Sequence, residues 1–174
     1  MIAILEIGTS LKFKHISENT NKLVSALLDN QDFLKWITHL EDDPLSMPDV
    51  SPQHILGNRL VLTEMEEKIL TERIIKVFLT PFRGVPHKGK ILADDIYELN
   101  ITMPNEYSYI YPYRLDRRGE IARQVAISLD QQRVTGIGEV EVGSNYNMYK
   151  INETYVGMTL FITVTNGSTK EIVW

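Results

Sequence analysis

The sequence predicts an α+β fold: a mostly antiparallel sheet with one long amphipathic helix packed on it and additional N-terminal helices. Residues 155–165 alternate between apolar and polar or small side chains, which is typical of a strand with one buried face. Residues 116–133 carry apolar side chains at helical spacing and run directly into another strand, predicted over residues 134–142. A helix followed by strands of the edge type is the construction of small subunits that assemble through sheet edges.

The apolar positions of these segments define the faces that we expect to be buried. In the last strand they are Val156, Met158, Leu160, Ile162 and Val164, and in the helix they are Ile121, Ala122, Val125, Ala126 and Leu129. Gly119 weakens the first turn of this helix by about 1 kcal/mol relative to alanine.

Length and composition indicate one globular domain. The chain has 174 residues, of which 43% are hydrophobic and 24% charged. We expect a single α+β domain over residues 1–174, with an N-terminal helical region and proline-rich loop over 1–60 and a core of sheet and helix over 61–174. The absence of cysteine excludes disulfides, thiolate nucleophiles and sulfur-ligated zinc, and it suits a reducing cytoplasm or a particle assembled there.

Helical spacing in the N-terminal part begins near residue 19 and continues to Leu40. The polar residues 29–31 are expected to break or kink this helix, and Ser17 or Thr20 to cap its start. Residues 41–52 contain three prolines and several acidic residues, which predicts an exposed loop.

Two strands with a loop between them are predicted in the middle of the chain. Residues 71–79 are rich in β-branched and aromatic side chains, and residues 91–102 return as a second strand. Residues 81–90 hold two prolines and two glycines, which favours a loop that joins the strands as an antiparallel pair. A short helix over residues 63–70 is expected to precede them, with Thr63 as its cap.

Charge and hydropathy exclude some classes of partner. The formal net charge of −5 argues against broad, sequence-independent binding to nucleic acid. No apolar run reaches the ~20 residues that a membrane-spanning helix needs, and the start of the chain lacks the basic region of a signal peptide. We therefore expect no membrane partner.

No pattern in the sequence points to catalytic, cofactor-binding or metal-binding residues. The four histidines stand far apart, and residues 41–43 lack the ligand spacing of a calcium loop. Gly136 and Gly138 follow a helix and open a strand, the reverse of a dinucleotide-binding loop. The alternative is a metal-dependent, nuclease-like enzyme of nucleic acids, whose strand carboxylates would have to converge in space: Asp94, Asp95, Glu98, Glu139 and Glu141.

The segment before the long helix holds the candidate contact residues. Four tyrosines alternate there, and three arginines follow: Tyr107, Tyr109, Tyr111, Tyr113, Arg114, Arg117 and Arg118. Tyrosine is enriched in protein interfaces, because it buries much surface and keeps a hydrogen-bonding tip. Cations near a helix N-terminus oppose the helix dipole, so another contact must favour the arginines. The readings left open are a subunit or DNA contact, or a half-buried strand and salt bridges within the chain.

Several of these segments resemble proteins of the neck and tail-completion region of tailed bacteriophages, including tail terminators. In the C-terminal half they are the helix over residues 115–132, the run Arg133-Val-Thr-Gly-Ile-Gly-Glu-Val140 and the strand Tyr155-Val-Gly-Met-Thr-Leu160. In the N-terminal part, Leu27-Leu-Asp-Asn-Gln-Asp-Phe-Leu-Lys-Trp36 and Asp43-Pro-Leu-Ser-Met-Pro-Asp49 are similar to head–tail connector proteins. Together the segments cover more than half of the chain.

The resemblance implies a structural virion protein with no enzymatic activity. It would be a tail terminator or head–tail connector that forms a homo-oligomeric ring, a hexamer, where the tail meets the head. Its partners would be the tail tube protein and the neck proteins of the head, with DNA passing through the lumen, and the ring would assemble in the host cytoplasm. The long acidic, proline-rich loop departs from compact terminators, which leaves a stopper or adaptor position open. A non-viral protein-binding module is a further alternative.

Overall fold

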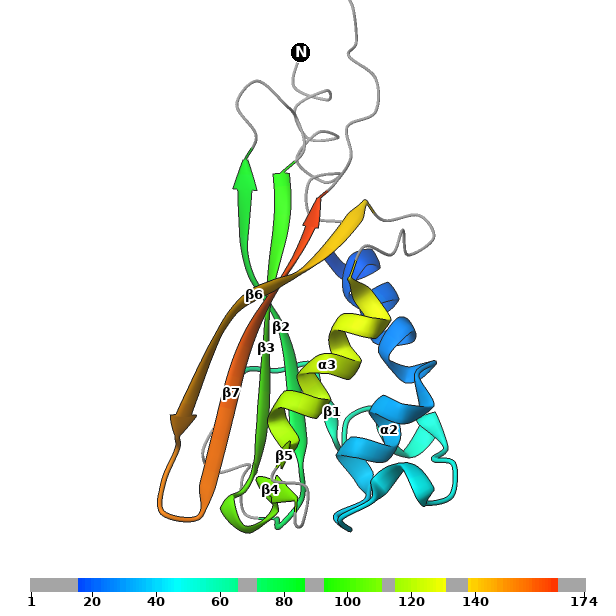
Figure 1. Ribbon diagram of the computed structural model, residues 1–174. Helices are drawn as coiled ribbons and strands as arrows, with labels where there is room; N and C mark the ends of the chain where they lie inside the picture. The colour runs from blue at the N-terminus through cyan, green and yellow to red at the C-terminus, as the bar shows by residue number, and fades with distance from the viewer. Residues whose placement is uncertain (1–15, 66–71, 87–92, 111–114, 131–137, 166–174) are drawn as a thin grey trace, which may run out of the picture.

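The computed structural model describes residues 16–65, 72–86, 93–110, 115–130 and 138–165. Within these residues the chain forms two layers, with a five-stranded sheet on one side and helices on the other (Figure 1). This confirms the predicted α+β class, including the mostly antiparallel sheet and the helix packed on it.

The sheet has the strand order β1-β2-β3-β7-β6. The strands are β1 (Leu60–Val61), β2 (Lys76–Pro86), β3 (Ala93–Pro104), β6 (Glu139–Lys150) and β7 (Tyr155–Thr165). All neighbours run antiparallel except β1 and β2, which are parallel. A second, two-stranded sheet joins β4 (Tyr109–Ile110) to β5 (Leu115–Asp116).

Among the described residues, three α-helices make up the second layer: residues 16–28, α2 (Gln31–Thr38) and α3 (Arg117–Leu129). Short 3-10 helices occupy the connections, at η1 (Pro44–Ser46), η2 (Pro52–His54) and η4 (Asn105–Tyr107). The predicted break at residues 29–31 is confirmed, because Asn30 caps α2 by accepting a hydrogen bond from the Phe33 N–H at 3.1 Å. Its amide also donates to the Ser128 hydroxyl at 2.8 Å, and so ties the break to α3.

The predicted caps at Ser17 and Thr20 are wrong. Both residues lie inside the helix of residues 16–28, and the Thr20 hydroxyl donates back to the Ile16 carbonyl at 2.7 Å. Such a bond to the carbonyl four residues earlier satisfies the hydroxyl within the helix. The helix predicted over residues 63–70 falls mostly outside the described residues.

Two strands, β2 and β6, run well past their predicted bounds. β2 begins at Lys76 and continues to Pro86, so residues 81–86 are strand and not loop. A register shift between Pro81 and Arg83 accommodates the proline, which has no N–H to donate to the ladder. β6 also extends far beyond residue 142. β7 has the predicted bounds but lies between β3 and β6, so its expected edge character is wrong; of the two C-terminal strands only β6 is an edge.

The helix-facing side of the sheet carries the main core. β3 contributes Tyr97, Leu99, Ile101 and Met103, and β7 contributes Met158, Leu160, Ile162 and Val164. Opposite them lie Ile121, Val125 and Leu129 of α3, with Phe33, Leu34 and Ile37 of α2. The alternation of β7 and the spacing of α3 are thus the two halves of one interface.

A buried arginine joins α3 to the chain that follows α2. The Arg117 side chain is 1% exposed, and its N–H groups donate to four main-chain carbonyls. The acceptors are His39 (2.8 Å), Leu40 (3.1 Å), Glu41 (2.7 Å) and Tyr107 (3.0 Å). Three of them belong to the residues directly after α2, which ends at Thr38.

The same guanidinium lies over the Trp36 ring, 5.5 Å from its centroid. Burial lowers the pKa of Arg117, while Asp42 and Glu41 oppose this shift. The side chain thus combines charge-assisted hydrogen bonds and a cation–π contact at one point, and these offset the loss of its hydration.

We predict that Arg117→Ala lowers the free energy of unfolding by about 3 kcal/mol, because it leaves buried carbonyls without donors. Arg123→Ala is the matched control: Arg123 lies on the same helix, is exposed and bonds only to Glu120 across one turn. Arg123→Ala should lower the free energy of unfolding by less than about 0.5 kcal/mol. Urea unfolding followed by circular dichroism measures both, and equal values would show that the carbonyl contacts add no stability.

Tyr97 gives a pH-dependent prediction. Its hydroxyl donates to the Ile16 carbonyl at 3.1 Å, and burial raises its pKa to about 12. The unfolded chain loses this proton near pH 10, so the folded state binds more protons between pH 10 and 12 and its stability falls there as pH rises. The difference in unfolding free energy between the wild type and Tyr97→Phe should therefore shrink from pH 9 to pH 11.5. If urea titrations gave the same difference in unfolding free energy at pH 9 and at pH 11.5, this prediction would be contradicted.

Candidate functional site

The two predicted contact arginines that the structure describes are buried inside the subunit. Arg117 binds the carbonyls named above. Arg118 pairs with Asp116, with 2.6 Å between Nη2 and Oδ2, and donates from Nη1 to the Gly157 carbonyl at 3.3 Å. The hydrogen bond with Asp116 raises the pKa of Arg118, against the effect of burial. Of the readings left open by the sequence, contacts within the chain account for both side chains.

The two described tyrosines of the same segment differ in their exposure to solvent. Tyr107 lies in η4 and is half-buried, and Tyr109 on β4 is exposed. Tyr111, Tyr113 and Arg114 lie outside the described residues, so their role as contact residues stays a prediction.

The carboxylates of the enzyme alternative lie on different faces and strands. Asp95 faces the helices and accepts a hydrogen bond from the Asn19 amide at 3.0 Å, whereas Glu98 faces the opposite side. Glu139 and Glu141 lie on β6, which β7 separates from β3. Among the described residues, no three His, Asp or Glu side chains gather in a way that could hold a metal ion.

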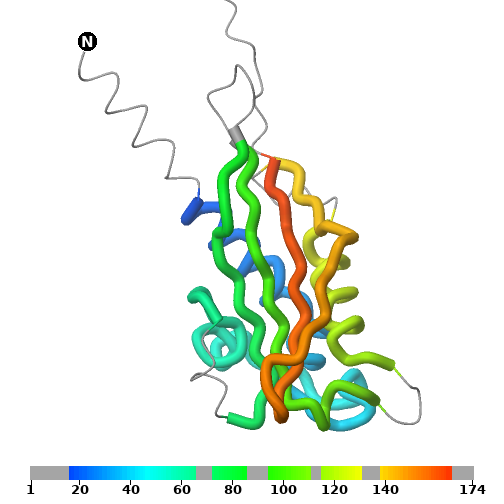
Figure 2. The backbone as a smooth tube through the Cα atoms, turned by 90° about the vertical axis from the view of Figure 1, so that its left-hand side faces the viewer, coloured from blue at the N-terminus to red at the C-terminus, as the bar shows by residue number. Residues whose placement is uncertain are grey.

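The opposite side of the sheet is here called the open face, because no described helix crosses it (Figure 2). It is formed by alternate residues of the inner strands, among them Glu98, Asn100 and Thr102 on β3 and Thr159, Phe161 and Thr163 on β7. A small apolar cluster of Phe78 and Tyr155, with Val61, Met65 and Ile151, lies at one end of it.

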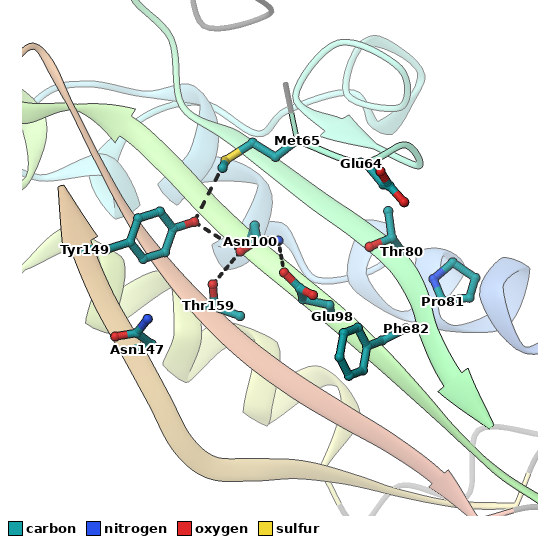
Figure 3. Close-up of a pocket in the computed structure, with 10 residues that line it drawn as sticks. All are labelled: Glu64, Met65, Thr80, Pro81, Phe82, Glu98, Asn100, Asn147, Tyr149 and Thr159. Atoms are coloured by element: carbon teal, nitrogen blue, oxygen red, sulfur yellow. Dashed lines mark hydrogen bonds between the residues drawn. The ribbon is translucent and has the colours of Figure 1, made fainter. Parts of the chain in front are cut away.

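A pocket of about 670 Å³ lies on the open face beside this cluster (Figure 3). Its lining comes from the segment after β1 and from the four long strands: Glu64, Met65, Thr80, Pro81, Phe82, Glu98, Asn100, Asn147, Tyr149 and Thr159. The sequence does not reveal this pocket, because its pattern predicts a loop over residues 81–90 and does not give the order of the strands.

A hydrogen-bond network holds the floor of the pocket. Asn100 is only 7% exposed, and its Oδ1 accepts from the Tyr149 hydroxyl at 3.1 Å and the Thr159 hydroxyl at 2.5 Å. Its Nδ2 donates to Glu98 Oε1 at 2.7 Å. Burial raises the pKa of Tyr149, which favours the neutral hydroxyl as donor. The two hydroxyls thereby fix which way the Asn100 amide points.

Gly157 creates the space in which the Tyr149 ring lies. The two residues are directly paired across β6 and β7, and a Cβ atom at residue 157 would lie 2.6 Å from Tyr149 Cζ. No real Cβ makes so close a contact, so the glycine is required for the ring to reach Asn100.

Aromatic side chains flank the pocket. The Phe82 and Phe161 rings lie 5.5 Å apart at a tilted angle, and both remain partly exposed. Phe82 occupies the register shift of β2 and lies on the open face, as Phe78 and Thr80 do on the same strand. The Arg83 guanidinium lies 5.9 Å from the Phe82 ring centroid, at cation–π distance.

The second candidate surface is the outer edge of β6, which within the described residues pairs only with β7. Near its start the edge is protected, because the Val142 N–H donates to Asp130 Oδ1 at 3.1 Å. A register shift between Val142 and Tyr146 follows, and beyond it Tyr146 is 61% and Met148 41% exposed. Exposed apolar side chains on a sheet edge are a recognised site of strand addition.

The ladder shows which backbone groups of β6 point outward. Near the hairpin the Ile151 N–H donates to the Tyr155 carbonyl at 3.0 Å. Because paired residues alternate between bonded and non-bonded positions, the N–H groups of Tyr146 and Met148 point away from β7. The edge therefore presents backbone donors and apolar side chains together.

The family model described as YomW matches residues 30–164, which include α2, α3 and, except for Thr165 at the end of β7, every strand of the main sheet. The chain belongs to the YomW family. That family is named after a phage-region gene of the SPbeta/skin type, so the protein is phage-associated. No curated protein matches the chain. In the described part of the chain, no helix is long and apolar enough to cross a membrane.

We predict that Gly157→Ala lowers the free energy of unfolding by about 1–3 kcal/mol, because the added methyl displaces the Tyr149 ring from Asn100. Gly119→Ala is the matched control, since nothing lies within 4 Å of a Cβ there and the residue is helical. It should stabilise the protein by about 0.5–1 kcal/mol.

A double-mutant cycle tests the mechanism. In a Tyr149→Ala background the cost of Gly157→Ala should largely disappear, because the ring that it displaces is gone. Urea unfolding of the four variants measures the coupling, and additive effects would exclude the Tyr149 contact as the cause.

Proposed function

We propose that this phage-associated protein is a structural virion protein of a tailed phage, a tail terminator or head–tail connector subunit. It forms a ring where the tail meets the head, and acts through protein contacts and not by catalysis. The proposal is supported by membership of the YomW family, by the resemblance of the helix and C-terminal strands to tail-completion proteins, and by the two-layer α+β fold.

The outer edge of β6 is the observation that carries the proposal. Its second half offers outward N–H groups together with Tyr146 and Met148, the combination required for adding a strand from another subunit. The other edge of the sheet is different, because there the two-residue strand β1 pairs with Val77 and Phe78 of β2. Contact between two different surfaces, repeated around an axis, closes into a ring.

Such a ring has two faces, one for the tail tube protein and one for the neck proteins of the head, and DNA passes through its lumen. The subunit assembles in the host cytoplasm and ends in the virion. A hexamer is the expected stoichiometry, and the mass of the assembled particle measures it.

The test is absolute mass by light scattering on a size-exclusion column, for the protein alone and mixed with the tail tube protein of the same phage. We expect a closed oligomer, or a monomer that assembles only on the tube. A monomer indifferent to the tube would contradict the proposal.

Edge variants locate the contact. Tyr146→Lys with Met148→Lys should weaken assembly at least about tenfold, since charge on an edge opposes strand addition. Met148→Pro should act in the same direction, because it removes an outward N–H without breaking a bond to β7. Leu45→Lys is the matched control: Leu45 is 39% exposed but lies in η1, away from the sheet. Assembly of both edge variants at wild-type strength would exclude β6.

A further inference from the structure

The pocket on the open face has the chemistry to hold a cation. Glu64 and Glu98 contribute carboxylates to its wall, and the described residues that line it include no Lys, Arg or His. Within the described residues, neither carboxylate forms an ion pair. Figure 3 shows that they come from separate segments of the wall, Glu64 from the chain after β1 and Glu98 from β3.

The buried network orients one of these carboxylates. Asn100 is held by two hydroxyls and donates to Glu98 Oε1, so the carboxylate has a set direction and its second oxygen remains as an acceptor. A preorganised carboxylate loses little freedom when it binds a cation. The neighbouring Phe82 ring adds a surface on which a planar cation can stack, as the Arg83 guanidinium does 5.9 Å from its centroid.

The pocket suits a side chain of another protein better than a free small molecule. Pro81, Phe82 and Asn147 in its wall are exposed, so a small ligand would stay largely in water, whereas small-molecule sites bury most of their ligand. The exposed Phe82, Phe161 and Val85 around it form apolar surface that a protein partner would cover.

We propose that this pocket receives a basic side chain, arginine in preference to lysine, from a partner protein. A guanidinium binds a carboxylate in a fork and stacks on an aromatic ring, which an ammonium does less well. The inference goes beyond ring formation, because it concerns the open face and not the β6 edge, and it is tested on the isolated chain.

The experiment is a titration of the isotope-labelled full chain with acetyl-arginine-amide, followed by NMR at the Asn100 side-chain amide and the Phe82 ring. A ligand of this size should bind with a Kd on the order of 1–10 mM. Acetyl-citrulline-amide has nearly the same shape without the charge, and should bind at least about fivefold more weakly.

Two variants locate the site. Glu98→Gln should raise the Kd for acetyl-arginine-amide at least about fivefold, because the substitution removes the charge and keeps the shape of the side chain. Glu139→Gln is the matched control, since Glu139 also faces the open side but does not line the pocket, and its Kd should equal that of the wild type.

Several results would overturn the inference: no shift at these probes, equal binding of the citrulline analogue, or unchanged binding by Glu98→Gln. Agmatine binding at least tenfold more tightly than acetyl-arginine-amide would overturn the assignment to a protein side chain. None of these results bears on assembly through the β6 edge. Failure of this inference can therefore be distinguished from failure of the proposed ring.

Discussion

The helix layer depends on the buried guanidinium of Arg117. A charge removed from water is tolerated only when every donor finds a partner, and here the partners are carbonyls from the chain after α2 and from η4. The contact therefore determines where α2 ends relative to α3, and α3 in turn packs on β3, β6 and β7. Trp36 completes the arrangement by covering the cation with its ring.

The two faces of the sheet are stabilised differently. The helix-facing side is apolar, apart from Asp95 and the Tyr97 hydroxyl where the helix of residues 16–28 crosses it. The open face instead holds its inner residues by side-chain hydrogen bonds centred on Asn100. Polar groups buried in this way are satisfied by one arrangement only, which makes them better suited to a recognition surface than to a general core.

Both candidate surfaces arise where the pairing of strands is irregular. The register shift of β2 lies at Phe82, beside the pocket, and the shift of β6 separates a protected start from an exposed second half. Irregular pairing re-aims side chains without interrupting the sheet. The pocket and the edge thus both lie at local departures from the regular ladder.

The sequence by itself determined the elements whose signal is local. The alternation of residues 155–165, the spacing from Arg117 to Leu129 and the polar break at Asn30 each follow from a repeat or a cap within a few residues. Only the tertiary structure decided that β7 is interior, that residues 81–86 continue β2, and that Arg117 and Arg118 are buried. It also decided the pocket, because Glu64, Glu98 and Tyr149 come from segments far apart in the chain. Strand order and long-range burial depend on which distant segments pack together. The periodicity of side chains along the sequence does not specify these contacts.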